Sequence, residues 1–476
     1  MHVHLIGVCG TGMGSLAGLL KAAGHHVTGS DKAFHAPMGP ALAEWGVQTM
    51  EGYGPQNLEP APDLVVVGNV CRPDHVEARA AIDGGLAYAS FPATLATHFL
   101  EDRQPFVVAG THGKTTTSTL LAYLLDRTGR DPGMLIGGIP CDFDASFRLG
   151  AAGAPFVVEG DEYDSAFFEK SPKLWQYRAQ AAILTSLEHD HIDIYPDERS
   201  YHHAFEHFAE EMPADGVLVA WAGSAAVRAV ASRAACRVVW YALSDDDVGD
   251  VSPTWVAAPI KPRGGLQPFD LFIGGSATPT VMSPLSGSHN VLNATAAIAL
   301  SAEAGGANLH SLTTALRSFR GVKRRQELLA TVDGVRVYDD FAHHPTAVRE
   351  TLRGLKARHP EGALIAVFEP RSATASRQLH QAEYPSAFNA ADAVIVAPVG
   401  RPEISDDERL DVQSIVERIG PHAVAPRNHE SILESLLERA GAGDTIVLMS
   451  NGSFGGLHDT LLAELTLRAS DRSEGA

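Results

Sequence analysis

The chain has 476 residues, of which 45% are hydrophobic and 20% are charged, and its formal net charge at pH 7 is −20. This length exceeds what one hydrophobic core supports and predicts about two to four domains. The acidic balance excludes a general nucleic-acid binder, because such a protein needs a basic face to neutralise phosphates.

Residues 1–103 are predicted to form a first, Rossmann-like domain. A short apolar strand is expected at 2–6, and a glycine cluster and a helix over 15–23 follow it. Further strands are expected at 26–29 and at 63–68. Apolar strands that alternate with helices indicate a parallel, doubly wound sheet.

Residues 104–322 are predicted to form a central domain of the P-loop ATPase type with a mixed sheet. A strand over 105–109 leads into a loop and a helix over 115–126, and a later helix covers 290–304. The segment 250–285 is richer in glycine, proline and threonine, which indicates short antiparallel strands. Further apolar strands are expected at 155–159, 181–185 and 216–220.

Residues 323–476 alternate again and predict a second Rossmann-like domain, so that the whole chain is expected to be an α/β protein of three domains. Pro345 is a good first-turn residue and predicts a helix start. The last eight residues, 469–476, are expected to be disordered. The strands are expected at 335–339, 363–368, 393–397 and 445–449.

Cysteine usage and the lack of long apolar runs predict a soluble cytoplasmic protein. The four cysteines are widely spaced, without a C-x-x-C pair, so neither a disulfide framework nor a structural zinc site is expected. The opening MHVHLIGVCG lacks the basic region and the long apolar run of a signal peptide. No stretch of about 18 apolar residues is present, and no membrane partner is expected.

A glycine-rich string, GVCGTGMG at 7–14, follows the first strand and opens a helix. Its G-x-x-G-x-G spacing is displaced from the dinucleotide fingerprint, but its glycines would let the backbone approach a diphosphate at a helix N-terminus. Asp31 lies at the end of the next strand. Three interpretations stay open: a nicotinamide dinucleotide, another nucleotide diphosphate, or a turn that only packs a helix on a strand.

The string VVAGTHGKTTTST at 107–119 lies between a strand and a helix, which is the context of a phosphate-binding loop. Lys114 can reach phosphates, and Thr115 can offer its hydroxyl to Mg²⁺. The nearest first glycine is Gly110, two residues later than the usual spacing requires. Glu159 ends a neighbouring apolar strand and is a natural Mg²⁺ ligand; a solvated acidic loop is the alternative.

A further string combines polar side chains at a predicted strand end. In LTSLEHDHIDIY (184–195), the residues His189, Asp190, His191 and Asp193 crowd a strand end. A transition-metal site there is disfavoured, because alternating side chains cannot all face one ion. One imidazole that assists Mg²⁺ and one carboxylate that fixes the loop are the preferred interpretation.

Amides and arginines complete the candidate residues. Asn290 and Asn293 share one helix face, which suits adenine and ribose edges, although a capped helix packed on alanines is the alternative. The Arg324–Arg325 pair at the second boundary could clamp a phosphate. Arg371 is a candidate for a substrate carboxylate, with a surface arginine as its alternative.

Together these strings resemble the Mur ligases, which are ATP-dependent amide-forming enzymes of bacterial peptidoglycan synthesis, over nearly the whole chain. The short phosphate loop is the family's form, so Gly110 is its expected first glycine. The resemblance implies ATP and Mg²⁺ as cofactors and an acyl-phosphate mechanism, with Lys114, His191 and Arg325 as catalytic residues. It implies Mg²⁺ ligation by Thr115, Glu159 and His191. The implied ATP site comprises Gly110, Thr111, His112, Gly113, Lys114, Thr115, Thr116, His289, Asn290, Asn293, Arg325 and Asp340.

The resemblance also implies substrate sites in the outer domains. The first domain would bind the UDP-sugar through Gly7, Gly10, Thr11, Gly12, Met13, Ser30, Asp31 and Asn69. The third domain would bind the incoming peptide through His343, His344, Arg371 and Ser450. The sequence predicts no oligomeric state.

Two kinds of Mur ligase accept UDP-N-acetylmuramate before any peptide is attached: one adds L-alanine, and the other adds the recycled tripeptide L-alanyl-γ-D-glutamyl-meso-diaminopimelate. EYDSAFF, EPRS and SNGSFGG are similar to the tripeptide-adding kind. One departure stands out, because several members carry a carbamylated lysine about fifteen residues after the histidine that corresponds to His191. No lysine occurs there, and Glu206 occupies roughly that place.

Two rival functions are also compatible with these strings. An NAD-dependent oxidoreductase would use the first glycine cluster but leave the second loop unexplained. A nucleotide-binding regulatory protein would use both loops without catalysis.

Overall fold

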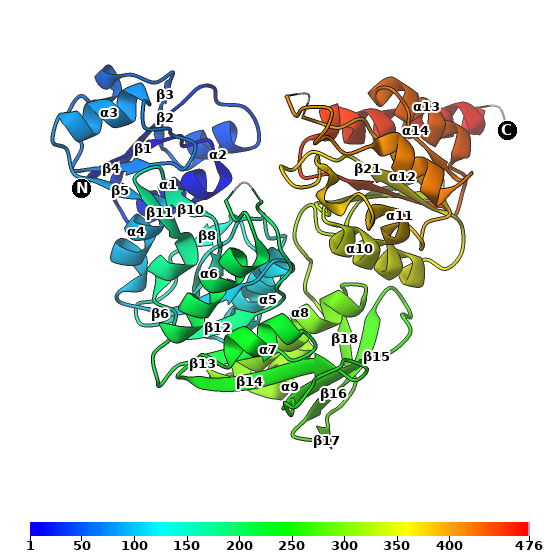
Figure 1. The fold of residues 1–476 in the computed structure, drawn as a ribbon, viewed down its shortest axis with the longest axis horizontal. Helices are drawn as coiled ribbons and strands as arrows, with labels where there is room; N and C mark the ends of the chain where they lie inside the picture. Colours follow the sequence, from blue (N-terminus) through cyan, green and yellow to red (C-terminus); the bar gives the residue numbers. More distant parts are fainter. Residues whose placement is uncertain (193, 402, 475–476) are drawn as a thin grey trace.

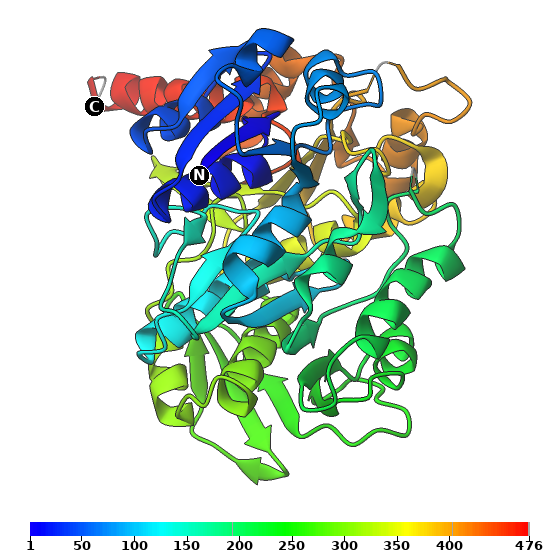
Figure 2. The same cartoon turned by 90° about the vertical axis from the view of Figure 1, so that its left-hand side faces the viewer.

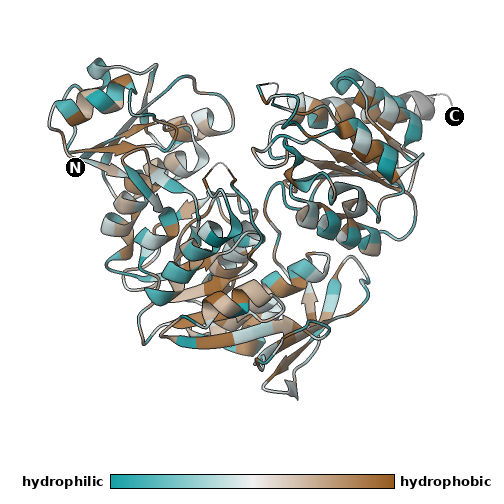
Figure 3. Cartoon of the chain, in the orientation of Figure 1, coloured by the Kyte–Doolittle hydropathy of each residue, from teal (hydrophilic) through white to brown (hydrophobic). Residues whose placement is uncertain are grey.

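The computed structural model describes residues 1–192, 194–401 and 403–474. It has three α/β units in chain order, with the first and third units above the two sides of the middle one (Figure 1). Turned by 90°, the first unit faces the viewer and the third lies behind it (Figure 2). Apolar residues concentrate in the central strands of the units (Figure 3). The predicted α/β class is confirmed, while the boundaries at residues 103 and 322 stay predictions.

The first unit is a five-stranded parallel sheet in the order β3-β2-β1-β4-β5. Side chains alternate along β1, so Val3 and Leu5 pack with α1, while Ile6 packs on the opposite face with α3. This is the predicted doubly wound arrangement. Its elements are β1 (His2–Ile6), α1 (Thr11–Ala22), β2 (His26–Asp31), α2 (Met38–Glu44), β3 (Gln48–Glu51), β4 (Leu64–Val67), α3 (Val76–Asp83), β5 (Tyr88–Ser90) and α4 (Phe91–Leu95).

The middle unit has a large mixed sheet in which β12, β6 and β9 are parallel neighbours. Ala109 at the end of β6 pairs with Leu184 of β12 and Gly160 of β9, so the segments after these three strands emerge at one edge. The core strands are β6 (Gln104–Ala109), β7 (Gly133–Leu135), β8 (Phe147–Arg148), β9 (Pro155–Gly160), β12 (Ala181–Leu184), β13 (Val217–Trp221) and β14 (Arg237–Leu243).

The predicted antiparallel segment of the middle unit is also present. β15 (Trp255–Pro259), β16 (Gln267–Ile273), β17 (Ser276–Ala277) and β18 (Val281–Ser283) are joined by antiparallel pairings. A separate hairpin joins β10 (Asp164–Ala166) to β11 (Glu169–Pro172). The helices are α5 (Lys114–Arg127), α8 (Ser288–Glu303) and α9 (Leu309–Leu316) on one face, and α6 (Glu198–Glu210) and α7 (Ala225–Ala231) on the other.

The third unit has the strand order β19-β20-β24-β21-β22-β23, in which only β19 is antiparallel to its neighbour. Helices pack on both faces. The strands are β19 (Glu327–Val332), β20 (Val335–Asp340), β21 (Leu364–Phe368), β22 (Ala393–Val396), β23 (Ala423–Val424) and β24 (Thr445–Met449). The helices are α10 (Pro345–Arg358), α11 (Tyr384–Ala387), α12 (Val412–Ile419), α13 (His429–Arg439) and α14 (Leu457–Glu474).

Two local predictions were wrong. The tail from residue 469 was expected to be disordered, but α14 continues to Glu474, and residues 475–476 lie outside the described ones. Leu457, Leu461 and Leu465 are buried at a four-residue spacing, which anchors the helix on the third sheet.

The first helix also begins at Thr11 rather than at residue 15. Gly12 and Gly14 lie within the helix, and Gly14 packs against Met38, where a Cβ atom would not fit. None of the helices in the described part of the chain has both the length and the apolar character that a membrane span requires.

Candidate functional site

A cavity of about 730 Å³ lies where the three units meet. The first unit contributes Thr11, Gly12 and Phe91 to its lining. The loop between β6 and α5 and the end of β12 line its centre, and the start of α10 lines the side of the third unit. A concave site of this size that carries convergent polar groups is a default candidate for substrate binding.

The loop after β6 depends on two glycines. Gly110 has φ +128°, and a Cβ atom there would collide with the Thr185 hydroxyl and lie 2.8 Å from the Ser186 carbonyl oxygen. Gly113 has φ +82°, and a Cβ atom there would lie 2.6 Å from Asn293 Oδ1. Both positions therefore require glycine, which gives the shortened loop a steric basis.

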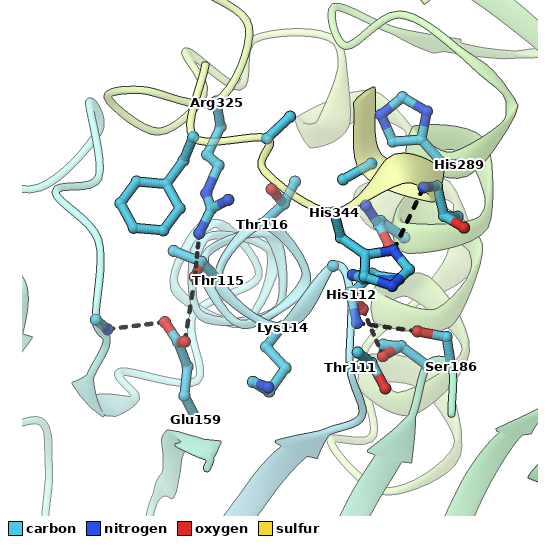
Figure 4. A pocket seen from close by; sticks show the side chains of 18 of the residues that line it. Thr111, His112, Lys114, Thr115, Thr116, Glu159, Ser186, His289, Arg325 and His344 are labelled. Atoms are coloured by element: carbon cyan, nitrogen blue, oxygen red, sulfur yellow. Dashed lines mark hydrogen bonds between the residues drawn. The ribbon is translucent and has the colours of Figure 1, made fainter. Parts of the chain in front are cut away.

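Hydrogen bonds to Ser186, which follows β12, hold the residues between these glycines in place. The amide of Thr111 donates to the Ser186 carbonyl at 2.8 Å, and the amide of His112 donates to Ser186 Oγ at 2.9 Å. Thr116 lies in the first turn of α5 and lines the cavity. Figure 4 shows these side chains around the pocket together with Lys114 and Thr115.

Lys114 points to a buried carboxylate that the predicted site did not include. Its Nζ donates to the Gly110 carbonyl at 2.6 Å and to Glu162 Oε2 at 2.8 Å. Burial lowers the pKa of Lys114, but the Glu162 carboxylate outweighs it and the net pKa is raised. Burial likewise opposes ionisation of Glu162, yet the charge of Lys114 and a hydrogen bond from His191 lower its pKa to about 2.

Thr115, Glu159 and Arg325 form a second cluster. Thr115 Oγ1 donates to Glu159 Oε2 at 3.1 Å, and Arg325 Nη2 donates to Thr115 Oγ1 at 3.2 Å. The amide of Gly137 donates to the other Glu159 oxygen at 2.8 Å. Burial raises the pKa of Glu159. A hydroxyl and a carboxylate oxygen side by side are the donor set that Mg²⁺ prefers.

The side chain of His191 contacts Glu162, and no contact with Thr115 or Glu159 is found among the described residues. Its Nε2 is 3.3 Å from Glu162 Oε1, and its backbone has φ +53°, which is unusual for a residue other than glycine. Burial lowers the pKa of His191, but the carboxylate of Glu162 raises it overall. Asp190 accepts a hydrogen bond from Thr374 of the third unit at 2.6 Å. Asp193, a predicted neighbour, lies outside the described residues.

The helix α8 brings the predicted amides together beside the loop. Asn293 Nδ2 donates to Asn290 Oδ1 at 3.1 Å, and Asn290 Nδ2 donates to the Ser286 carbonyl at 2.8 Å. His289 lines the same cavity, and burial lowers its pKa to about 4, so it is neutral at pH 7. The amides partly satisfy each other. The N-cap of α8 is Gly287, which makes no side-chain cap hydrogen bond, so the cap of the alternative interpretation is not found among the described residues.

Backbone geometry fixes the position of Arg325 in the segment between α9 and β19. Its two neighbours, Arg324 and Gln326, have φ +62° and +50°. Arg324 Nη2 donates to the carbonyl oxygens of Ser450 and Gly452 at 2.7 and 2.6 Å, which ties this segment to the third sheet. Strained residues of this kind persist where the surroundings fix them.

Asp340 lies at the end of β20 and lines the cavity. Its carboxylate accepts hydrogen bonds from the amides of Gln326 and Ala342 at 2.7 and 2.8 Å. It therefore holds the Arg325 segment to the third unit, and it could still receive a ribose hydroxyl on its remaining lone pairs.

The predicted UDP-sugar residues lie in the loop at the start of α1 and around it, and some of them are buried. Asp31 accepts from the Cys9 amide at 2.8 Å, which shapes the glycine loop, whereas Ser30 is fully buried and donates to Glu77 at 2.6 Å. Met13 is buried, and Asn69 is exposed. Of the predicted residues Gly7, Gly10, Thr11, Gly12, Met13, Ser30, Asp31 and Asn69, the cavity lining includes Thr11 and Gly12.

The predicted peptide residues separate into two pairs. His343 and His344 line the cavity, but Arg371 and Ser450 are not among the described lining residues. The Ser450 hydroxyl is buried and donates to Glu369, and Arg371 Nη1 lies 3.5 Å from the same carboxyl group. Arg371 is 44% exposed, so its guanidinium is accessible from outside.

Glu188 was missed, although it belongs to the quoted string SLEHDH. Its Oε2 accepts from Thr346 Oγ1 of the third unit at 2.8 Å and lies 3.3 Å from His112 Nε2. The sequence signal was its place in the segment after an apolar strand, four residues beyond the end of β12. Glu206, by contrast, lies on α6 and pairs with Arg233 at 3.3 Å. It is not among the described residues that line the cavity, so it does not replace the missing lysine.

Comparisons with known proteins agree with this geometry. The family described as "Mur ligase family, catalytic domain" matches residues 2–103, "Mur ligase middle domain" matches 108–301, and "Mur ligase, glutamate ligase domain" matches 324–452. A Haemophilus influenzae protein named UDP-N-acetylmuramate–L-alanyl-γ-D-glutamyl-meso-2,6-diaminoheptandioate ligase is 35% identical over 98% of this chain and 100% of its own length.

Two other relatives show which kinds of Mur ligase this chain is similar to. The crystal structure of a murein peptide ligase from Psychrobacter arcticus is 36% identical, covers 98% of this chain and 99% of its own, and has a TM-score of 0.71. A Roseiflexus protein named UDP-N-acetylmuramate–L-alanine ligase is 34% identical over 84% of this chain and 85% of its own length. The chain therefore belongs to the Mur ligase family, whose members are ATP-dependent ligases that form C–N bonds.

Proposed function

We propose that this ligase joins the lactyl carboxylate of UDP-N-acetylmuramate to the free amine of the tripeptide L-alanyl-γ-D-glutamyl-meso-diaminopimelate. The observation that carries the proposal is one cavity lined by a phosphate loop, by the glycine loop of the first unit and by the histidines of the third. Similarity to the Haemophilus influenzae and Psychrobacter arcticus proteins supports the choice of tripeptide.

The reaction proceeds through an acyl phosphate. The lactyl carboxylate attacks the γ-phosphorus of ATP, and ADP leaves. The amine of the tripeptide then attacks the activated carbonyl, and the tetrahedral intermediate expels phosphate as the amide forms and the amine loses its proton. Little covalent chemistry falls to the protein, whose contribution is positioning and neutralisation of charge.

Lys114 and Arg325 supply positive charge to the transferring phosphoryl group. Both are held before substrate arrives, Lys114 by Glu162 at 2.8 Å and Arg325 by Thr115 at 3.2 Å. Such preorganised charges are worth more in a water-poor site than in bulk solvent.

Mg²⁺ would be held by Thr115 and Glu159, with His191 as a further ligand. The adjacent hydroxyl and carboxylate oxygens fit this ion. When bound, Mg²⁺ supplies charge that neutralises the phosphate oxygens. His289, Asn290, Asn293 and Asp340 would contact the nucleoside.

The substrate sites are assigned to residues of the first and third units. The glycine loop and Asp31 would receive the UDP portion at the N-terminus of α1, where exposed amides favour a diphosphate. His343 and His344 would face the incoming amine, with Arg371 as an outer contact for a peptide carboxylate. We place the reaction in the cytoplasm, because the four cysteines are free, as suits a reducing compartment.

Phosphate release tests the choice of substrate. With ATP, Mg²⁺ and UDP-N-acetylmuramate, the tripeptide is expected to support faster turnover than L-alanine at equal concentration. Faster turnover with L-alanine would instead assign the L-alanine ligase activity. Thermal stabilisation by NAD(H), but by neither ATP nor UDP-N-acetylmuramate, would support an oxidoreductase.

A further inference from the structure

A second group of potential metal ligands lies beside the phosphate loop. His112, Glu188 and His344 each place one ligand atom within 4.8 Å of the others. They come from the loop after β6, from the segment after β12 and from the N-cap of α10. The group therefore joins the middle unit to the third one, and it is separate from the Thr115–Glu159 pair. None of its residues is used as a metal ligand in the proposed reaction.

Two of the three distances between the ligand atoms match those of a four-coordinate metal centre. Glu188 Oε2 is 3.3 Å from His112 Nε2 and 3.5 Å from His344 Nδ1. Bonds of about 2.1 Å to a tetrahedral Zn²⁺ ion place neighbouring ligand atoms about 3.4 Å apart. The third separation, between the ligand atoms of His112 and His344, is at most 4.8 Å, so a small dication can contact all three atoms after one imidazole moves closer.

Hydrogen bonding around His344 leaves room for a cation between its Nδ1 and Glu188, although Glu188 Oε2 also accepts from Thr346 Oγ1 at 2.8 Å. The amide of Thr346 donates to His344 Nδ1 at 3.3 Å, so this nitrogen is an acceptor and carries a lone pair. The acceptor Glu188 Oε2 faces it across 3.5 Å. Two acceptors that face each other repel, and a positive ion between them converts the repulsion into attraction. The long cap hydrogen bond is weak and would be replaced by the metal bond.

Burial and access also suit a bound ion. His344 is 5% exposed, and its Nε2 is buried without a hydrogen-bond partner among the described residues. The imidazole rings of His112 and His344 lie 4.6 Å apart and tilt by 45°. All three side chains nevertheless line the large cavity, through which an ion can enter. Figure 4 shows His112 and His344 on the side of the pocket opposite Glu159.

We propose that His112, Glu188 and His344 bind a transition-metal dication of the Zn²⁺ class. Two imidazoles and one carboxylate favour such an ion over Mg²⁺, which prefers oxygen ligands. Three protein ligands leave a fourth position toward the cavity for water or an anionic oxygen. The bound ion joins the phosphate loop to α10 and so stabilises contact between the two units.

The test measures metal binding directly. Chelator-treated full-length protein is titrated with Zn²⁺ in competition with a chromogenic chelator, under saturating Mg²⁺ and without nucleotide. The wild type is expected to bind one Zn²⁺, and Co²⁺ is expected to give the visible absorption of a four-coordinate centre. Loss of a direct ligand in Glu188→Gln or His344→Gln should weaken Zn²⁺ binding by at least about 100-fold, because even outer groups cost 10–100-fold.

Two control variants make the result specific. Glu159→Gln removes the proposed Mg²⁺ ligand and should leave Zn²⁺ affinity unchanged. His203→Gln, which removes a 68% exposed histidine of α6, should leave it unchanged as well. Melting temperatures without metal establish that each variant is folded, and Zn²⁺ should raise that temperature in the wild type but not in Glu188→Gln.

The proposal is overturned if the wild type binds no Zn²⁺ under saturating Mg²⁺. It is also overturned if folded Glu188→Gln and His344→Gln bind as tightly as the wild type. In either case Glu188 is only a hydrogen-bonding link between the units. Because no outcome depends on the ligase substrates, failure here would leave the proposed reaction untouched.

Discussion

Replacing Lys114 by methionine should destabilise the middle unit, because the substitution leaves Glu162 charged and buried. The Glu162 side chain is 1% exposed, and its Oε2 lies 2.8 Å from Lys114 Nζ. A carboxyl group whose pKa falls from 4.5 to about 2 on folding contributes about 3 kcal/mol to stability at neutral pH. Measured losses for one half of a buried pair, about 3–5 kcal/mol, are of the same size.

A loss of about 3 kcal/mol corresponds to a fall of about 6–12 °C in melting temperature for a unit of roughly 200 residues. The double variant Lys114→Met/Glu162→Gln should regain most of this stability, because it removes the uncompensated charge, yet it should remain without ligase activity. Lys170→Met is the matched control: Lys170 is 66% exposed and pairs with Asp164 at 2.7 Å, so its loss should cost less than about 1 kcal/mol.

The assay is thermal unfolding at pH 7, followed by the same measurement at lower pH. The pKa of Glu162 is lowered in the folded state, so its contribution is complete above about pH 4.5 and is lost as pH falls toward 2. The wild type should therefore lose stability more steeply than Lys114→Met below pH 4.5. A melting temperature of Lys114→Met within about 2 °C of the wild type, or a double variant as unstable as the single one, would refute the reasoning.

Three further substitutions test other contacts of the site. Gly110→Ala should abolish ATP binding in a nucleotide-protection melt, because its Cβ has no room, whereas Gly129→Ala, also at positive φ but in open space, should retain it. Arg325→Met should lower kcat by about 100- to 1,000-fold with the chain still folded, as measured by phosphate release. Thr374→Val should lower the unfolding free energy by about 1–3 kcal/mol in denaturant titration, because it leaves buried Asp190 without a 2.6 Å partner, while an unchanged midpoint would contradict this contact.

The sequence predicted those features that depend on short-range patterns. Apolar runs located the main strands, because buried parallel strands are continuously hydrophobic. The loop residues Lys114 and Thr115 were recognisable because a strand, two glycines and a helix are adjacent in the chain. The three-domain α/β class followed from the alternation of these elements. The wrong prediction for the tail arose because residues 469–474 contain no large apolar side chain, while the leucines that anchor α14 precede them.

Short-range patterns did not predict the contacts that depend on long-range pairing. Ser450 follows an apolar strand and resembled an available ligand, but β24 lies beside β21, so its hydroxyl meets Glu369. Glu188 contacts Thr346 of the third unit, 158 positions away in sequence. Only the register of β12 beside β6 and the docking of the third unit bring such groups together, and neither is encoded in a local motif.

The carboxylates around the loop have different electrostatic surroundings, and this difference argues for where a divalent ion belongs. Glu162 already has a cation at 2.8 Å, and its pKa is lowered to about 2. Glu159 receives, among the described residues, a hydroxyl and an amide at hydrogen-bond distance, and burial raises its pKa. A charge buried without a bonded counter-ion gains most from a dication. The same sequence segment, EGDE, therefore supplies one carboxylate that positions the lysine and one that is left to hold Mg²⁺.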